Sequence, residues 1–189
     1  MNAEPVVFAK PNDWLKWLKK NHAASEGIWL RLAKKGSAIQ SITYAEALEA
    51  ALCYGWIDAQ KKPESTEAWL QRFTPRRPRS IWSKRNRNIA LSLIAAERMQ
   101  PAGLAQIERA KKDGRWEAAY DSPATATVPE DFAAALAQNP RAKAFFATLD
   151  SANRYAVLFR IQTVKRTETR ERRIRQFVEM LSRHEKIHP

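Results

Sequence analysis

The sequence predicts an α+β protein, in which a small antiparallel sheet is covered by helices and is followed by an all-helical C-terminal module. Short segments with alternating apolar and polar residues lie in the first half of the chain. They are interleaved with segments whose apolar residues recur every three or four positions, which is the helical pattern. Beyond a linker that contains prolines, only the helical pattern remains.

The first elements are a helix, a strand and a second helix. "KPNDWLKWLKKN" has one apolar stripe, and Asn12 is a suitable N-cap for it. The alternation in "GIWLRLAK" predicts a strand over residues 28–33. In "TYAEALEAALCYG", Thr43 and Glu46 have the spacing of a capping box, and Gly55 is a typical helix stop.

Two further strands and two helices complete the first region. "WIDAQK" and "EAWLQRF" both have strand character, and the turn-rich "KPEST" between them indicates a hairpin. Together with residues 28–33 they predict the antiparallel sheet. A helix is then expected from about Lys84 to Met99, and another from Pro101 to Gly114.

The chain is predicted to contain two domains. The first spans residues 1–120 and contains the strands. The segment "DSPATATVP", residues 121–129, has the small, polar, proline-bearing composition of a linker. Residues 130–189 form the helical module, whose helices are expected to begin near Pro129, Asn139, Ser151 and Thr167.

Composition and charge limit the compartment and the partners. Cys53 is the single cysteine, so no intramolecular disulfide can form, which fits a reducing compartment. The N-terminus lacks a signal-peptide pattern, and no apolar run reaches the length of a membrane span, so we expect a cytoplasmic protein. The formal net charge of +13 favours encounters with anions.

The segment "RFTPRRPRSIWSKRN", residues 72–86, concentrates cations and contains no acid. Ser83 is a good N-cap, yet the helix that follows carries Lys84, Arg85 and Arg87 in its first turn. A helix N-terminus carries about half a positive charge and prefers anions, so these cations are unfavourable there. Local rules are often broken at functional sites, and backbone N–H groups with arginines are the components of an anion site. The alternative is a solvated basic loop.

Two other residues have structural and functional interpretations. Asp58 lies in an otherwise apolar strand, where acids are rare. A structural brace to Arg72 on the neighbouring strand is favoured over a role as catalytic base. Cys53 is interpreted as a small buried apolar residue rather than a nucleophile.

Metal and cofactor motifs give little support for such groups. "HEKIH", from His184 to His188, matches the zinc-protease pattern, but it is followed by one residue only and has no third ligand downstream. The chain has five glycines and no phosphate-binding or dinucleotide-binding glycine motif. We therefore expect no metal and no cofactor.

The motifs "ALCYGWIDAQ", "RFTPRRPRSIWSKRN" and "MQPAGL" resemble the YdeI/OmpD-associated family, which is associated with bacteriocin protection. In the C-terminal module, "VPEDFAAALAQNPRAKAFFATLDSANRY" and "VKRTETRERRI" resemble the helical OmdA-type domain of that family. The resemblance implies a link to tolerance of bacteriocins or antimicrobial peptides and to an outer-membrane porin. It implies no particular reaction or ligand.

The basic segment and the resemblance together predict one pocket for a small anion. Arg72 and Arg76 would clamp the ligand, and Asp58 would orient Arg72. Ser83 and the start of the helix would donate hydrogen bonds to the ligand. The full set of predicted ligand-binding residues is Trp56, Asp58, Arg72, Arg76, Ser80, Trp82, Ser83, Asn86, Lys165, Arg170 and Arg173, with the two tryptophans as walls and the last three as a second basic cluster.

Three functions remain open at this point. The first is a binding protein for an anionic small molecule, with a role in stress tolerance. The second is an enzyme that acts on a small anionic substrate through Asp58 or Cys53. The third is a nucleic-acid binder that uses scattered charge, although no recognition motif for nucleic acid is present. No oligomeric state is assigned.

Overall fold

The computed structural model describes residues 4–189, and it confirms the predicted fold class. The chain packs as two compact units. The first contains the residues up to Trp82 together with Asn86–Glu117, and the second contains Ser83–Arg85 and Ala118–Pro189. The division into residues 1–120, 121–129 and 130–189 stays a prediction.

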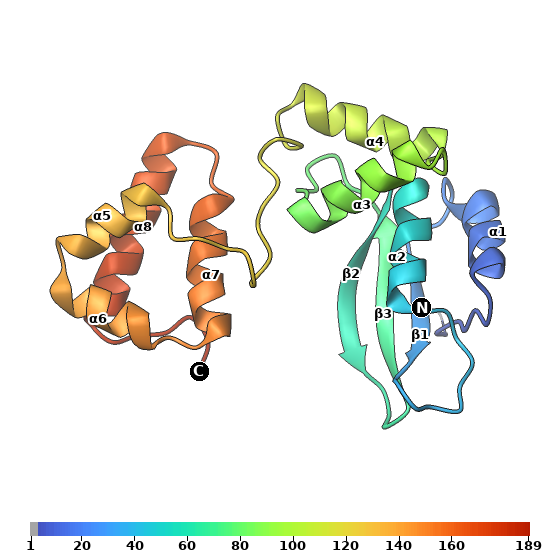
Figure 1. Cartoon of the computed structure of the whole chain (residues 1–189), viewed down its shortest axis with the longest axis horizontal. Coiled ribbons are helices and arrows are strands. Elements are labelled where there is room, and N and C mark those ends of the chain that lie inside the picture. The colour runs from blue at the N-terminus through green and yellow to red at the C-terminus, as the bar shows by residue number, and fades with distance from the viewer. Residues whose placement is uncertain (1–3) are drawn as a thin grey trace. The chain divides into compact units, whose positions relative to one another are not determined.

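The first unit is built around a three-stranded antiparallel sheet with the strand order β1-β3-β2 (Figure 1). In chain order its elements are α1 (Pro11–Asn21), β1 (Ile28–Ala33), α2 (Tyr44–Cys53), β2 (Trp56–Pro63), β3 (Ala68–Pro75), α3 (Lys84–Ala95) from Asn86 onward, and α4 (Pro101–Lys112). The strands β2 and β3 form the predicted hairpin, and β3 lies in the centre because it also pairs with β1.

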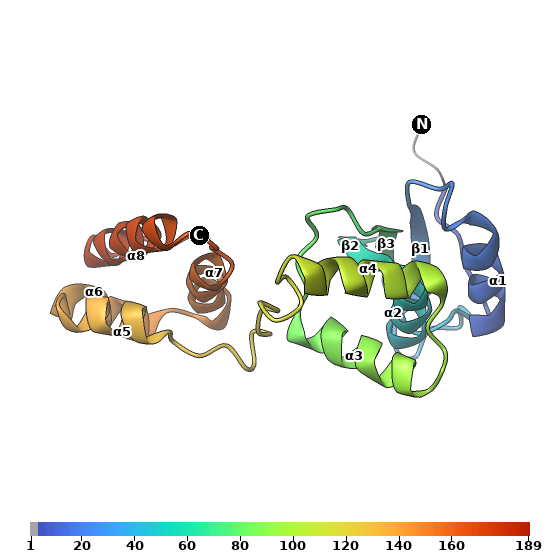
Figure 2. The ribbon, with the colours of Figure 1, turned by 90° about the horizontal axis from the view of Figure 1, so that it is seen from above.

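The two faces of the sheet differ in their covering. Helices α2, α3 and α4 lie on the same side of the sheet (Figure 2). We call this side the closed face, and Leu30, Leu32 and Phe73 are buried on it. Because successive side chains of a strand point to opposite faces, Arg72 and Thr74 point the other way. We call that side the open face.

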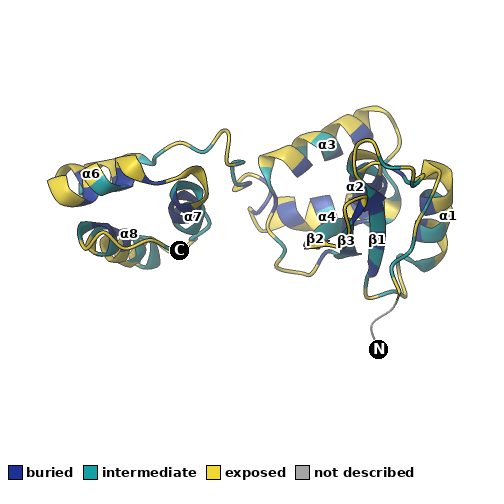
Figure 3. Ribbon diagram, turned by 90° about the horizontal axis from the view of Figure 1, so that it is seen from below, coloured by how far each residue is buried: buried dark blue, intermediate teal, exposed yellow. Residues whose placement is uncertain are grey.

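The core of the first unit is aromatic. Trp14 of α1 and Phe73 of β3 are fully buried, with their ring centroids 5.9 Å apart. Trp56 of β2 packs edge-on against Trp14 at 6.5 Å and donates an indole hydrogen bond to the carbonyl of His22 at 3.0 Å. In Figure 3 the buried residues (dark blue) of this unit include alternate residues of β1 and most of α2.

The two edge strands of the sheet, β1 and β2, differ in how their backbone pairing is completed or interrupted. The outer edge of β1 is bridged by Val6, whose N–H donates to the carbonyl of Trp29 at 2.8 Å. On β2, the register shifts between Asp58 and Lys61, so that the two intervening residues oppose a single residue of β3. This is a β-bulge, which bends an edge strand and increases its twist.

The helix boundaries follow the capping chemistry with small corrections. The capping box of Thr43 and Glu46 is present at α2, as predicted. Helix α1 begins at Pro11 with Lys10 before it, so Asn12 lies inside the helix and is not its cap. Proline suits the first turn because its missing N–H would have no partner there.

The second unit contains the helices α5 (Glu130–Ala137), α6 (Pro140–Thr148), α7 (Ser151–Gln162) and α8 (Thr167–Ser182). Asp150, rather than Ser151, caps α7, because its carboxylate accepts from the N–H of Asn153 at 2.7 Å. The helices bury an apolar core that includes Phe132, Leu136, Phe146, Val157, Ile161, Ile174, Phe177 and Leu181.

Candidate functional site

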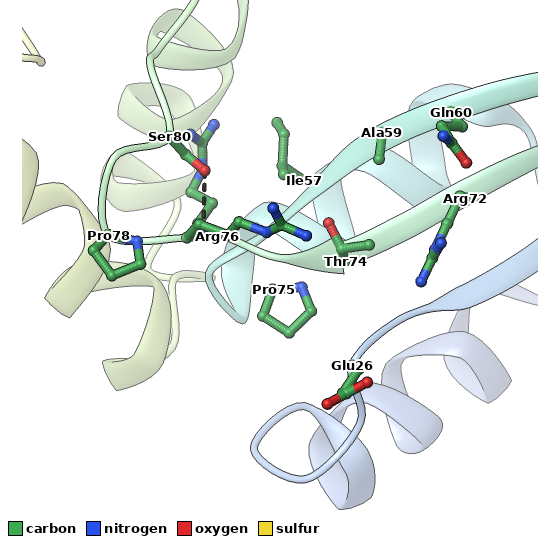
Figure 4. A pocket seen from close by; sticks show the side chains of 11 residues that line it. Glu26, Ile57, Ala59, Gln60, Arg72, Thr74, Pro75, Arg76, Pro78 and Ser80 are labelled. Atoms are coloured by element: carbon green, nitrogen blue, oxygen red, sulfur yellow. Dashed lines mark hydrogen bonds between the residues drawn. The ribbon is translucent and has the colours of Figure 1, made fainter.

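A pocket of about 700 Å³ lies in the first unit, on the open face of β2 and β3 and beside the loop that follows β3 (Figure 4). Its size is within the range of small-molecule sites. The lining residues are Glu26, Ile57, Ala59, Gln60, Arg72, Thr74, Pro75, Arg76, Arg77, Pro78 and Ser80. Of the predicted site residues, the pocket therefore brings together Arg72, Arg76 and Ser80.

Strand alternation places Arg72 in this pocket. Phe73 fills the closed face, so its neighbours Arg72 and Thr74 are directed to the open face. The bulge residues Ala59 and Gln60 lie opposite Arg72 and line the same pocket. The Nε atom of Arg72 is buried and has no hydrogen-bond partner. Buried polar groups nearly always have a partner, which makes this donor unusual.

Arg76 is held in place by its surroundings. Its backbone N–H donates to the carbonyl of Gly55 at 3.0 Å, which fixes the end of β3 against the start of β2. Its guanidinium lies 3.5 Å from the ring centroid of Trp82 and donates to the carbonyl of Ile81 at 3.3 Å. With an exposure of 5%, Arg76 supports the pocket wall as well as lining it.

The loop after β3 has a second support that the sequence did not reveal. Arg115, 6% exposed, pairs with Asp113 at 2.7 Å and donates to the carbonyl of Ser80 at 2.6 Å. The hydroxyl of Ser80 in turn accepts from the N–H of Arg77 at 3.0 Å. These bonds fix the course of the loop and thereby the direction of its side chains.

Unpartnered donors are concentrated around this loop. Like the Nε of Arg72, the Nε1 of Trp82 and the Nη2 of Arg115 are buried without a hydrogen-bond partner. Leaving a buried donor unsatisfied costs about 1–3 kcal/mol. Of these three donors, only the one on Arg72 belongs to a residue that lines the pocket.

Several predicted residues lie away from the pocket lining. Trp56 and Trp82 are buried in the core of the first unit, and Trp82 packs edge-on against Trp116 at 4.8 Å. Asn86 is also buried, on the first turns of α3. The two tryptophans are thus core residues and do not form walls of this pocket.

The predicted brace between Asp58 and Arg72 is wrong. Asp58 pairs in register with Phe73, so it points to the closed face, whereas Arg72 points to the open face. The carboxylate of Asp58 accepts instead from the hydroxyl of Tyr44 at 2.8 Å. The bulge that follows Asp58 leaves no directly opposed cross-strand acid for Arg72.

The start of α3 follows Ser83, as expected, but it is engaged by the protein itself. The backbone N–H of Lys84 donates to the carbonyl of Tyr120 at 2.8 Å, and its ammonium pairs with Asp121 at 2.7 Å. These contacts lie within the second unit. Ser83 does not line the pocket, so the basic segment presents its arginines from β3 and the loop rather than from the helix N-terminus.

The second basic cluster has partners of its own. The Nε of Arg170 donates to Asp131 at 2.6 Å, and its Nη1 donates to the carbonyl of Ile161 at 2.9 Å. The hydrogen bond from Arg170 holds the pKa of the Asp131 carboxyl below its usual value. Lys165 is exposed, and Arg173 lies 6.0 Å from the ring of Phe177. That these cations serve the same ligand as Arg72 stays a prediction.

The candidate nucleophile and metal ligands have unfavourable surroundings. Cys53 is 2% exposed, and burial raises the pKa of its thiol, so little thiolate forms at neutral pH. Helix α8 ends at Ser182, before His184, so His184 and His188 do not share a helix face. Among residues 4–189, no three or more histidine, cysteine, aspartate or glutamate side chains are grouped as metal ligands.

The sequence comparisons agree with this two-part organisation. Residues 6–106, more than half of the 189, match the family described as "Domain of unknown function (DUF8412)", and the chain belongs to that family. Residues 125–184 match the family described as "Bacteriocin-protection, YdeI or OmpD-Associated". This confirms the recognised family in the C-terminal module. No curated protein and no solved structure matches the chain significantly.

Over the described part of the chain, no helix combines the length and the apolar character that crossing a membrane requires.

Proposed function

We propose that this protein binds a small anionic molecule in the pocket on the open face of its sheet. The observation that carries the proposal is that Arg72, Arg76 and Arg77 line one cavity on the open face. Three arginines in a pocket lined by a single acid produce a positive potential, and a concave site focuses it.

The chemistry of the lining fits a carboxylate or phosphate on a larger body. The arginine fork matches the planar oxygen pair of a carboxylate and two oxygens of a phosphate. Thr74, Ser80 and Gln60 line the same cavity and supply neutral hydrogen-bonding groups. Ile57 and Pro75 supply an apolar surface against which the carbon skeleton of the ligand can lie.

A protective role fits this binding function only indirectly. The C-terminal match carries a bacteriocin-protection description, but a protein with a net charge of +13 repels cationic peptides. We therefore place the protective effect in the binding of an anionic metabolite, lipid component or regulatory partner.

Neither candidate catalytic group of the enzyme alternative is placed to act on a ligand in the pocket. Asp58 is on the closed face, hydrogen-bonded to Tyr44 and outside the pocket. Cys53 is buried with a raised pKa. The nucleic-acid alternative keeps only the overall charge as its support.

The test compares two arginines of one loop. Arg77 and Arg79 are both exposed, but only Arg77 lines the pocket. The wild type, Arg72→Gln, Arg77→Gln and Arg79→Gln are screened by thermal shift against anionic metabolites, nucleotides and short nucleic acids at two salt concentrations. Arg76 is avoided because its contact with Trp82 is part of the fold.

We expect a small-molecule ligand whose effect persists at higher salt. At 100 times its Kd such a ligand stabilises the protein by about 2.7 kcal/mol. Arg72→Gln and Arg77→Gln should each weaken binding by about tenfold or more, as expected for a charged hydrogen bond, while Arg79→Gln should not. Shifts with nucleic acid alone, lost at higher salt and reduced equally by Arg77→Gln and Arg79→Gln, would contradict the proposal. So would the absence of any shift.

A further inference from the structure

The acid of the pocket is Glu26. It lies in the segment between α1 and β1, it is exposed, and all other charged residues of the lining are arginines. Figure 4 shows its carboxylate at one end of the pocket, apart from Ser80 and Pro78 at the other. The pocket therefore has arginine cations over most of its charged lining and one carboxylate at one end.

Glu26 reaches the pocket because its neighbour is a glycine. Gly27 has a φ of +141°, which L residues rarely adopt. A Cβ on Gly27 would lie 2.8 Å from the Cγ2 of Thr74, 2.9 Å from the carbonyl oxygen of Phe73 and 3.3 Å from the Nε of Arg72. The backbone at Gly27 thus packs against β3 at a distance that leaves no room for a side chain. Ser25 stabilises this turn, since its hydroxyl accepts from the N–H of Gly27 at 3.2 Å.

The charges of the pocket do not neutralise one another inside the protein. Among the described residues, Glu26 forms no ion pair and no side-chain hydrogen bond, although Arg72 and Arg77 line the same cavity. A carboxylate that simply balanced the arginines would be expected to pair with one of them. Here the two signs of charge are held apart on a common surface.

We propose that the ligand of this pocket is a zwitterion, which places a phosphate or carboxylate against Arg72 and Arg77 and an ammonium group against Glu26. This inference rests on the proposed anion-binding function. It adds that the site selects against ligands with negative charge alone, because Glu26 repels them at one end of the cavity.

The probes are two matched pairs that differ only in the ammonium group. The first pair is 3-aminopropyl phosphate and propyl phosphate, and the second is 5-aminovalerate and valerate. Near pH 7.5 an alkyl phosphate carries close to two negative charges, so its amino derivative has the smaller net negative charge. A pocket that responded only to net charge would prefer propyl phosphate.

Affinities are measured by chemical-shift titration of the full-length protein, which detects Kd values in the millimolar range. We expect wild-type protein to bind 3-aminopropyl phosphate up to about fivefold more tightly than propyl phosphate, which is the upper end of what one exposed charge pair provides. Glu26→Gln should reverse this order and strengthen the binding of propyl phosphate. Glu67→Gln, an exposed acid outside the pocket, is the control and should leave the order unchanged. The carboxylate pair shows which anionic group the arginines prefer.

The outcomes separate the two proposals. If propyl phosphate binds as well as its amino derivative, and Glu26→Gln shifts both affinities alike, the zwitterion inference is wrong while anion binding stands. If no member of either pair perturbs the pocket resonances, and Arg77→Gln changes nothing, then both are wrong. A preference for the zwitterion that Glu26→Gln leaves intact would also overturn the inference.

Discussion

Adjacent residues of β3 serve the two faces of one sheet in opposite ways. On the closed face, Phe73 is fully buried among aromatic rings and Gln71 donates to the carbonyl of Gln60 at 3.0 Å. On the open face, Arg72 has a buried nitrogen without a partner, and Thr74 lines the pocket. One strand thus combines a satisfied, stabilising row with a row that is under-satisfied. The under-satisfied row is where binding capacity is expected, because sites are commonly built at some cost in stability.

The largest test of this contrast is the pair Phe73→Ala and Thr74→Ala. Truncating a fully buried phenylalanine lowers the free energy of unfolding by about 3–5 kcal/mol. Thr74 is half-buried on the open face, so its truncation should cost under about 1 kcal/mol. Urea unfolding followed by tryptophan fluorescence measures both. Equal losses would show that the two faces contribute alike and would remove the distinction.

Gly27→Ala sharpens the contrast at the pocket rim. The added Cβ would meet the backbone of Phe73 and the side chain of Thr74, and alanine is strained at a φ of +141°. We expect a loss of about 1–3 kcal/mol, together with displacement of Glu26. Gly36, at a φ of +85° with open space around it, gives the control Gly36→Ala, in which alanine meets backbone strain but no steric clash. A Gly27→Ala protein as stable as the Gly36→Ala protein would contradict the close approach.

Arg72→Met tests whether Arg72 lowers the stability of the ligand-free protein while it supports anion binding. Methionine retains the length of the chain and removes the unpartnered donor. We expect the free energy of unfolding without ligand to stay the same or to rise by up to about 1 kcal/mol, while anion binding is lost. Arg31 also belongs to the open face, but its guanidinium donates three hydrogen bonds to the carboxylate of Glu64, so Arg31→Met should lower the stability slightly. If Arg72→Met is the more destabilising of the two, Arg72 is a structural residue.

The smallest expected effect comes from an arginine that does have a partner. The hydrogen bond from Arg170 lowers the pKa of Asp131 in the folded state, so the pair stabilises the protein above the unfolded pKa of about 3.9. This stabilisation is lost as the pH falls through the folded pKa. Because the pair is partly exposed, Asp131→Asn should cost no more than about 1 kcal/mol at pH 7. Thermal unfolding from pH 7 to pH 3 should show the two proteins converging; a gap that widens on acidification would contradict this.

The arrangement of elements was accessible from the sequence because local patterns determine it. The alternation in residues 28–33 and the capping box of Thr43 and Glu46 predicted β1 and the start of α2 correctly. Helix starts were misplaced by a residue where two polar residues compete, as at Asp150 and Ser151. Cap choice there depends on a single hydrogen bond, which a sequence pattern does not resolve.

The candidate site could be predicted only in part, because it depends on which face of the sheet each strand side chain points to. Of the residues that the basic segment 72–86 brought into the predicted site, Arg72, Arg76 and Ser80 line one pocket. The bulge after Asp58 places Asp58 opposite Phe73 and on the other face from Arg72, its predicted partner. The alternation in the sequence gives no sign of such an extra residue. Glu26 and Arg115 were missed because their relation to the loop depends on long-range packing. The sole local signal was Gly27, a glycine directly before a strand.

The bulge on β2 also has a consequence for how copies of the protein meet. An unpaired edge strand is a template on which another molecule can add its own strand, and this is a common start of aggregation. On β2 the bulge interrupts the regular hydrogen-bonding row, and the exposed Lys61 and Lys62 place like charges on any two such edges that approach. The same two bulge residues that line the pocket thus protect the sheet from strand addition. Regularising this strand to simplify the site would therefore also favour the fibrous state.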